Sequence, residues 1–247
     1  MSNKYDLSRS YDLVKDKILM PSRHYLKIIE IINKITKYNQ SDKKFLSVLD
    51  FGCGQGLLLK LLENYNYDLY GYDFSKELVE IASQITNKST IYNELPLDKK
   101  YDVIILSEVL EHLQDPLSIL KVIKDKLNDN GYLIITVPNA DRFNLGYFLH
   151  DKHQFQPIYD VMYTFSEISL ILKLASFRMI YWEGIGPIFL RYRKNKNLFF
   201  KIIYKILYEI LYPPIETFFK AVGLFHLRSK QLLVVSRVDK NIVLNID

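Results

Sequence analysis

The chain has 247 residues, a formal net charge of +5 at pH 7, 49% hydrophobic and 25% charged residues, and a single cysteine. This composition is typical of a soluble globular protein, and the length allows one large domain or one domain with an elaboration. One cysteine excludes an internal disulfide, which fits a reducing compartment, and the N-terminal segment MSNKYDLSRSYDLVKDK lacks the apolar stretch of a signal peptide. We therefore expect a cytoplasmic protein, and the mild, mostly scattered positive charge does not by itself indicate nucleic-acid binding.

Helical and strand-like patterns alternate along most of the chain, after a first amphipathic helix predicted at 22–38. The predicted strands are 45–51, 67–73, 101–107, 131–139, 178–184 and 231–238, and the helices between them are 57–65, 75–85, 115–131 and 164–177. Proline in the first turn and glycine after the last turn mark the limits of the 115–131 helix. Long crossovers between strands predict a doubly wound α/β sheet, in which ligands bind at the carboxyl ends of the strands.

Three regions follow from this pattern. Residues 1–44 form a helical cap, residues 45–184 with 230–239 form the core, and residues 185–229 form a helical insert.

Three of the nine glycines lie in the sequence VLDFGCGQG, directly after the strand predicted at 45–51. Gly52, Gly54 and Gly56 predict a sharp turn whose backbone is open to a ligand. Their G-x-G-x-G spacing differs from the G-x-G-x-x-G of dinucleotide-binding proteins. Asp50 before the turn disfavours a pyrophosphate and favours a cationic or amine-bearing ligand.

The strand predicted at 67–73 ends in GYDFS, with Asp73 about twenty residues after the glycine turn. A carboxylate at this place can accept hydrogen bonds from both ribose hydroxyls. Phe74 offers an apolar face for an adenine ring. Together with the glycine turn, these residues predict a nucleoside site.

This combination resembles the class I S-adenosylmethionine-dependent methyltransferases over residues 45–184 and the last strand. The resemblance implies a Rossmann-like, seven-stranded, mostly parallel sheet. It also implies that the glycine backbone binds the methionine part of the cofactor, that Asp50 orients the loop or the ammonium, and that Asp73 holds the ribose. The residues assigned to the cofactor are Asp50, Gly52, Cys53, Gly54, Gly56, Asp73, Phe74, Asn93 and Ser107, with Cys53 as a small packed residue and not a nucleophile.

One subsite departs from the family pattern. Ile91 stands where many relatives have the acid or amide that meets the adenine amino group. Asn93 or Glu94 could replace that contact, or the backbone alone could serve.

The strand predicted at 101–107 ends at Ser107 and is followed by EVLEHL. This stretch resembles the E-V-L-E-H segment of the branch that includes ubiquinone-biosynthesis O-methyltransferases. Three readings stay open: a structural or cofactor-shell role, His112 as a general base, or a divalent cation held by Glu108, Glu111 and His112. His150 and His153, in the loop after VPN, are two further candidate bases.

Residues 198–212 predict a helix that is apolar around most of its circumference. It is too short to span a bilayer, so it packs as a lid or in a dimer, or it lies on the inner face of a membrane through residues 189–225. Either arrangement favours an apolar-walled pocket for a lipid-linked, aromatic or glycolipid acceptor. Binding of single-stranded nucleic acid is disfavoured, because the helix is too apolar to stay exposed in water.

The sequence therefore predicts an S-adenosylmethionine-dependent methyltransferase that O-methylates a small-molecule, lipid-linked or saccharide acceptor. Two alternatives remain: a non-catalytic cofactor-binding subunit that anchors a partner enzyme, and a nicotinamide-dependent oxidoreductase. The intact glycine turn and Asp73 disfavour the first, and the glycine spacing with Asp50 disfavours the second.

Overall fold

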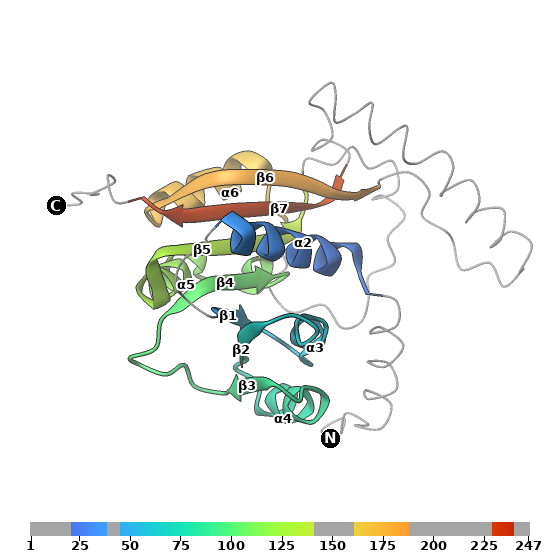
Figure 1. Cartoon of the computed structure of the whole chain (residues 1–247). Helices are drawn as coiled ribbons and strands as arrows, with labels where there is room; N and C mark the ends of the chain where they lie inside the picture. Colours follow the sequence, from blue (N-terminus) through green and yellow to red (C-terminus); the bar gives the residue numbers. More distant parts are fainter. Residues whose placement is uncertain (1–20, 39–44, 141–160, 188–228, 240–247) are drawn as a thin grey trace, which may run out of the picture.

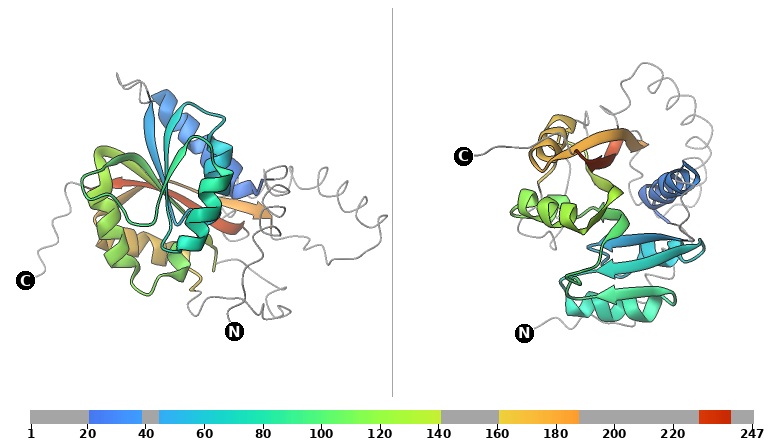
Figure 2. Two further views of the ribbon diagram at one scale, coloured as in Figure 1. Left: turned by 90° about the horizontal axis from the view of Figure 1, so that it is seen from below. Right: turned by 60° about the vertical axis from the view of Figure 1, so that its left-hand side comes forward.

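The computed structural model describes residues 21–38, 45–140, 161–187 and 229–239. Within these ranges a single sheet of seven strands has helices on both faces (Figures 1 and 2). The strands are β1 Leu46–Phe51, β2 Tyr67–Tyr72, β3 Ser89–Tyr92, β4 Tyr101–Ser107, β5 Leu127–Pro138, β6 Phe177–Pro187 and β7 Ser229–Val238. The helices are α2 Arg23–Tyr38, α3 Leu57–Leu62, α4 Lys76–Ile85, α5 Pro116–Lys126 and α6 Phe165–Leu174, with a short 3-10 helix η1 at Leu110–His112.

The strand order is β3-β2-β1-β4-β5-β7-β6. Strands β1 to β5 pair in parallel, whereas β7 is antiparallel to both of its neighbours. The predicted doubly wound, mostly parallel sheet is thus confirmed. The chain moves outward from β1 to β3 and then returns to β4, so the order reverses between β1 and β4. Ligands of such sheets bind at the carboxyl ends of the strands beside this reversal.

Alternate residues of the central strands face the two helical layers, as the two-residue period of a strand requires. Val48 of β1 packs with residues of α2, α3 and α4, whereas the adjacent Leu49 packs with residues of α5 and α6. The same alternation separates Val103 from Ile104 in β4. Burial on both faces explains why these strands read as continuous apolar runs.

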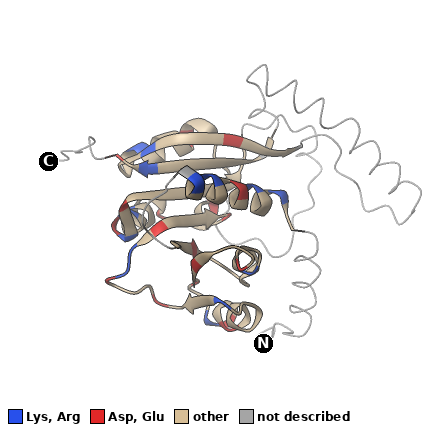
Figure 3. Ribbon diagram, in the orientation of Figure 1, with Lys and Arg blue, Asp and Glu red and all other residues tan. Residues whose placement is uncertain are grey.

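Helix α2 forms part of the first layer. Its buried residues are Ile28, Ile29, Ile31, Ile32 and Ile35. Several Lys and Arg residues and one acidic residue lie along this helix (Figure 3). The Lys27 ammonium pairs with Glu30 at 3.0 Å and with Glu183 of β6 at 2.8 Å. The helix predicted within the N-terminal cap therefore covers the sheet and shares its hydrophobic core.

The prediction for 115–131 is wrong at its carboxyl end. Helix α5 ends at Lys126, and Leu127 adopts extended φ and ψ angles of −83° and 141°. Leu127 is buried and starts β5 by pairing with Tyr101. Gly131 lies inside this strand, where a Cβ atom would come within 2.9 Å of the Leu127 side chain. Glycine is needed at this position because the Leu127 side chain packs closely against it, and it does not mark the end of a helix.

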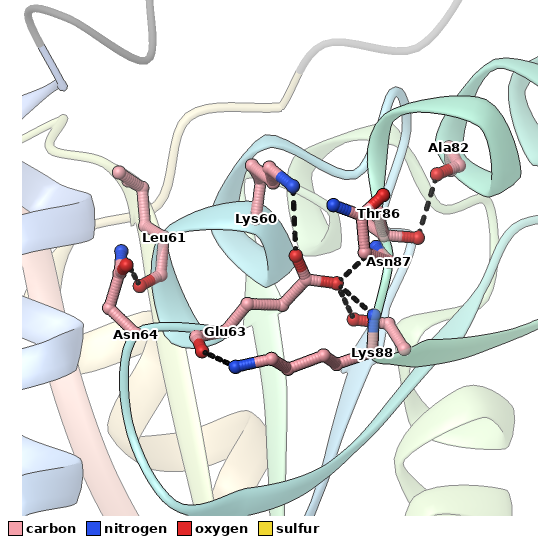
Figure 4. Close-up of polar contacts among 9 residues, drawn as sticks. Lys60, Leu61, Glu63, Asn64, Ala82, Thr86, Asn87 and Lys88 are labelled. Atoms are coloured by element: carbon pink, nitrogen blue, oxygen red, sulfur yellow. Dashed lines mark hydrogen bonds and ion pairs between the residues drawn. The ribbon is translucent and has the colours of Figure 1, made fainter.

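Glu63 joins the end of α3 to the connection between α4 and β3 (Figure 4). Its Oε1 atom accepts hydrogen bonds from the backbone N–H groups of Asn87 and Lys88, both at 2.6 Å, and from the Ser89 hydroxyl at 3.2 Å. The Lys60 ammonium donates to Oε2 at 3.0 Å. Burial raises the pKa of Glu63, but the hydrogen bonds from Lys88, Lys60 and Asn87 outweigh it and lower the pKa below the usual value. Glu63 thus fixes α3, which begins at the glycine turn.

We expect Glu63→Ala to lower the free energy of unfolding by about 1–2 kcal/mol, because the partly buried N–H groups of Asn87 and Lys88 lose their acceptor. The lowered pKa means that the Glu63 contribution is fully present above the ordinary glutamate pKa, and that it is lost progressively as the pH falls through the lower pKa of the folded protein. Urea unfolding at pH 7 and pH 4 measures both effects. Glu63→Gln keeps an acceptor oxygen and should lose less at pH 7. Equal losses in the two variants would contradict this role.

Candidate functional site

The glycine turn begins where β1 ends. The backbone N–H groups of Gly52 and Cys53 both donate to the carbonyl oxygen of Tyr72, at 2.7 and 2.9 Å, which anchors the turn to the end of β2. Gly52, Gly54 and Gly56 all have left-handed φ angles, of 80°, 53° and 77°. Residues that carry a side chain rarely adopt this backbone conformation, so the turn requires glycine at each of these three positions.

The three glycines differ in what surrounds them. A Cβ atom on Gly52 would lie 2.5 Å from Val109 Cγ2, and one on Gly56 would lie 3.2 Å from Ala82 Cα. A Cβ atom on Gly54 would meet nothing within 4 Å. Gly52 and Gly56 are therefore packing positions, whereas Gly54 presents bare backbone to open space, on which a ligand can lie.

Asp73 ties the turn to the start of α4. Its carboxylate is only 4% exposed. Oδ2 accepts a hydrogen bond from the Gly54 N–H at 2.9 Å, and Oδ1 accepts one from the Ser75 N–H at 2.9 Å. Each oxygen has a second lone pair, so the carboxylate can still accept from the hydroxyls of a sugar. Ser75 caps α4, because its hydroxyl accepts a hydrogen bond from the Leu78 N–H at 3.4 Å.

Asp50 places a second buried carboxylate beneath the turn. It lies near the end of β1, in register with Gly71 of β2 and Ile105 of β4, and is 3% exposed. Burial and the nearby charge of Asp73 raise the pKa of Asp50 to about 7, and no hydrogen bond from a described residue offsets them. A cation placed beside this carboxylate would offset its burial, and such an environment would suit the amine-bearing ligand that the sequence predicts.

Cys53 does not have the environment of a nucleophile. It is buried in the hydrophobic core, and burial, with the charges of Asp50 and Asp73, raises the pKa of its thiol above the usual value. A thiol that resists ionisation is a poor nucleophile. The packed role implied by the sequence fits this environment.

The predicted adenine residues lie beside Asp73. Phe74 is 85% exposed, so its ring is accessible to a ligand. The Asn93 Nδ2 group donates to the backbone oxygens of Asp73 and Phe74, both at 3.0 Å. Asn93 therefore fixes the segment that carries Asp73 and Phe74, and its Oδ1 atom is the acceptor that could meet an adenine amino group. Glu94 is exposed next to it.

The end of β4 borders the same edge of the sheet. Ser107 Oγ lies 3.2 Å from Thr136 Oγ1 of β5, and the Glu108 N–H donates to the Thr136 carbonyl at 2.9 Å. Glu108 has a φ angle of 57°, which is rare outside glycine and stores strain. The strained turn directs the chain from β4 into η1.

The predicted metal ligands do not form a metal site. Glu111 is 1% exposed, whereas the adjacent His112 is exposed. Neighbouring residues of a helical turn do not face each other, so the E-x-x-E-H spacing sends these two side chains in different directions. Among the described residues, no group of three or more His, Cys, Asp or Glu side chains could hold a metal ion. His150 and His153 lie outside the described residues.

One contact at this edge was not predicted from the sequence. His24 and Tyr25 lie in the first turn of α2, and His24 Nδ1 is 3.3 Å from Gln231 Nε2 near the start of β7. Tyr25 is one of the apolar positions of the helix predicted at 22–38, and the antiparallel β7 brings Gln231 to the carboxyl edge. No local signal in the sequence predicts this contact.

Comparison with known proteins shows which family the chain belongs to. A family profile described as a methyltransferase domain matches residues 22–179, more than half of the chain. The chain belongs to the methyltransferase domain family. The match begins just before α2, so this helix is part of the methyltransferase domain, together with the glycine turn and η1.

Curated relatives match up to about half of the chain. A ubiquinone biosynthesis O-methyltransferase of Rickettsia typhi is 32% identical over 127 residues, which cover 48% of this chain and 51% of that protein. The chain thus spans about half the length of the curated relatives it matches.

Solved structures share the fold of the methyltransferase domain. An S-adenosylmethionine-dependent methyltransferase of Clostridium acetobutylicum has a TM-score of 0.59 at 14% identity, covering 95% of this chain and all of that one. Magnesium protoporphyrin IX methyltransferase of Synechocystis, solved with bound S-adenosylhomocysteine, has a TM-score of 0.57 at 16% identity, covering 94% and 95%. At such identities the likeness concerns the fold.

The part of the methyltransferase domain that the structure describes contains no helix long and apolar enough to cross a membrane. The helix predicted at 198–212, and the whole of the membrane contact predicted at 189–225, lie outside the described residues.

Proposed function

We propose that the protein is an S-adenosylmethionine-dependent methyltransferase that O-methylates a small-molecule acceptor. The observation that carries the proposal is the pairing of an open backbone turn at Gly54 with two buried carboxylates, Asp50 and Asp73. The turn offers a surface without side chains, Asp50 a counter-charge, and Asp73 hydrogen-bond acceptors. These are the three features that a cationic nucleoside requires.

Each residue has a distinct task in this proposal. Asp50 binds the ammonium of the cofactor's amino-acid part, Asp73 accepts hydrogen bonds from the ribose hydroxyls, and Phe74 with Asn93 Oδ1 binds the adenine. S-adenosylmethionine, when bound, supplies a methyl group already activated on a sulfonium. The protein therefore contributes mainly positioning and exclusion of water. His112, exposed after the end of β4, is the candidate base for the acceptor hydroxyl.

The acceptor is proposed from the relatives and from the composition of the chain. The curated relatives are named ubiquinone biosynthesis O-methyltransferases, which supports an oxygen acceptor on a small molecule. The apolar sequence of 198–212 supports a lipid-linked or glycolipid acceptor, taken up at the inner face of a membrane through residues 189–225. Labelled S-adenosylmethionine mixed with the protein and fractionated cell lipids and small molecules tests this directly. Label should enter a lipid fraction, whereas label confined to water-soluble fractions would contradict a lipid-linked acceptor.

A non-catalytic cofactor-binding subunit would use the same turn but give no transfer in that experiment. The family and the curated relatives favour an enzyme. A nicotinamide-dependent oxidoreductase would place a pyrophosphate beside Asp50, where two negative charges would repel each other.

Gly54→Ala tests the cofactor turn separately from the fold. Alanine at a φ angle of 53° should cost about 1–2 kcal/mol of stability through backbone strain. No steric clash adds to this cost, because its Cβ atom would meet nothing within 4 Å. The same Cβ atom lies where the ligand is expected, so the affinity for S-adenosylhomocysteine should fall at least tenfold. Calorimetry and urea unfolding measure the two effects.

Gly186→Ala is the matched control, since Gly186 in β6 has a similar φ angle of 78°. It should lose comparable stability and keep the affinity. If Gly54→Ala bound the ligand as well as Gly186→Ala does, the ligand would not lie on the turn.

A further inference from the structure

We propose that Ser107, at the end of β4, donates a hydrogen bond to the oxygen atom that accepts the methyl group, and that Thr136 of β5 orients the Ser107 hydroxyl for this task. The proposal rests on the function proposed above and deepens it, because it assigns the Ser107 proton to the acceptor instead of the cofactor. It also makes Ser107 a residue that selects oxygen over nitrogen as the methyl acceptor.

Thr136 is a polar residue inside an apolar strand. Its side chain is fully buried, as are those of its neighbours Ile135 and Val137. Valine would fill a similar volume here without burying a hydroxyl, and a buried hydroxyl is costly unless it has a hydrogen-bond partner. That partner is Ser107 Oγ, which lies 3.2 Å from Thr136 Oγ1 and belongs to the residue directly opposite in the register of β4 and β5.

The burial of Thr136 decides which of the two hydroxyls donates. A hydroxyl has one proton and two lone pairs, and a buried proton without an acceptor costs more than an unused lone pair. In the described part of the chain the Thr136 hydroxyl has no partner besides Ser107, so Thr136 donates and Ser107 Oγ accepts. Ser107 is half-buried, so its own proton is available to a ligand.

The backbone holds Ser107 at the boundary between the cofactor turn and β5. The Glu108 N–H donates to the Thr136 carbonyl at 2.9 Å, which helps to hold Glu108 at its left-handed φ angle of 57°. Val109 lies against the glycine turn, since a Cβ atom on Gly52 would be 2.5 Å from Val109 Cγ2. Ser107 is therefore two residues from a contact with the cofactor turn and is paired with β5 on its other side, where an acceptor can lie beside the cofactor.

The transfer step leaves a lone pair of the acceptor oxygen for Ser107. The bond between the sulfur and the methyl carbon breaks, its electron pair stays on the sulfur, and one lone pair of the acceptor oxygen forms the new bond to carbon. The hydroxyl proton passes to His112, the candidate base, so the products are S-adenosylhomocysteine and a methylated oxygen. A second lone pair of that oxygen accepts the Ser107 hydrogen bond, which aims the first pair at the methyl carbon.

The same hydrogen bond disfavours a nitrogen acceptor. A neutral amine has a single lone pair, and that pair must attack the methyl carbon. A donor at this position would compete for the pair, whereas an oxygen has enough lone pairs to accept the hydrogen bond and attack at the same time. A hydroxyl that Thr136 turns into a donor therefore favours methylation of oxygen.

Ser107→Ala tests the contact, because it removes only the hydroxyl. Saturating labelled S-adenosylmethionine, mixed with fractionated cell lipids and small molecules, measures the transfer rate, and calorimetry with S-adenosylhomocysteine measures cofactor binding. We expect Ser107→Ala to slow transfer about tenfold or more and to leave the affinity within about twofold. Ser83→Ala, at an exposed serine of α4 whose hydroxyl donates to the Val79 carbonyl at 2.8 Å, is the matched control and should change neither.

Two variants of Thr136 separate orientation from packing. Thr136→Val removes the hydroxyl at similar volume, so it should slow transfer about fivefold while the protein unfolds at the same urea concentration or a higher one. Thr136→Ser keeps the hydroxyl and should restore the rate. Because Thr136 acts through Ser107, the double variant of Ser107→Ala and Thr136→Val should transfer label as slowly as Ser107→Ala alone.

The labelled product decides between oxygen and nitrogen. Mass spectrometry locates the transferred methyl group, which should be on oxygen. Label on nitrogen, an unchanged rate in Ser107→Ala, or a loss of affinity in that variant as large as its loss of rate would each overturn the proposal. Absence of transfer by the unmodified protein would instead refute the proposed function on which it rests.

Discussion

Asp50→Asn is expected to stabilise the free protein at pH 8 while sharply weakening its binding of S-adenosylmethionine. The pKa of Asp50 is raised to about 7 by burial and by Asp73, so at pH 8 the folded protein holds a buried charge that the unfolded chain exposes to water. Removing that charge should raise the free energy of unfolding by about 2–4 kcal/mol. Loss of the buried partner of an ammonium should lower the affinity about 100-fold.

The sign of the pH dependence follows from the same shift. Because the folded pKa is raised, the stabilising contribution of protonated Asp50 is fully present below the ordinary aspartate pKa and is lost as the pH rises through about 7. Cofactor binding should show the opposite trend, since a cation prefers the ionised carboxylate, and affinity should rise between pH 6 and pH 8. Asp50→Asn should flatten both profiles.

Urea unfolding and calorimetry at several pH values measure these effects. Asp68→Asn, at an exposed aspartate of β2, is the matched control and should change neither stability nor affinity. An Asp50→Asn protein that is no more stable at pH 8, and that binds the cofactor as tightly, would show that Asp50 is not the counter-charge.

Asp73→Ala is expected to weaken S-adenosylhomocysteine by about 1–3 kcal/mol, the range for hydrogen bonds to a charged acceptor. It should also lower stability by about 1–2 kcal/mol, because the N–H groups of Gly54 and Ser75 lose their acceptor. Calorimetry and urea unfolding again measure the two quantities. Asp73→Asn keeps one acceptor oxygen and should recover part of each loss. Unchanged affinity in the alanine variant would refute the ribose role.

Local chemistry made the glycine turn predictable. Left-handed φ angles at Gly52, Gly54 and Gly56 follow from the need to turn directly from β1 into α3, and only glycine adopts them freely. The cap of α4 by Ser75 is equally local. In both cases a few neighbouring residues are enough to predict the local structure.

Long-range features could not be predicted in the same way. The raised pKa of Asp50 depends on burial and on a charge from another strand. The contact of His24 with Gln231 spans most of the chain. Tertiary pairing also decided the end of α5, because Leu127 gains a partner in β4 when it leaves the helix. The predicted metal site is absent from the described residues for a local reason. Glu111 and His112 are neighbours in a 3-10 turn, where the first is buried and the second exposed.

In the proposed function, the bare turn at Gly54, with Asp50 and Asp73, binds S-adenosylmethionine. Calorimetric titration of the full chain at pH 8, with S-adenosylhomocysteine and with NAD, tests it most directly. We predict saturable binding of one S-adenosylhomocysteine per chain and no binding of NAD. Binding of NAD in place of S-adenosylhomocysteine, or of neither ligand, would contradict the claim.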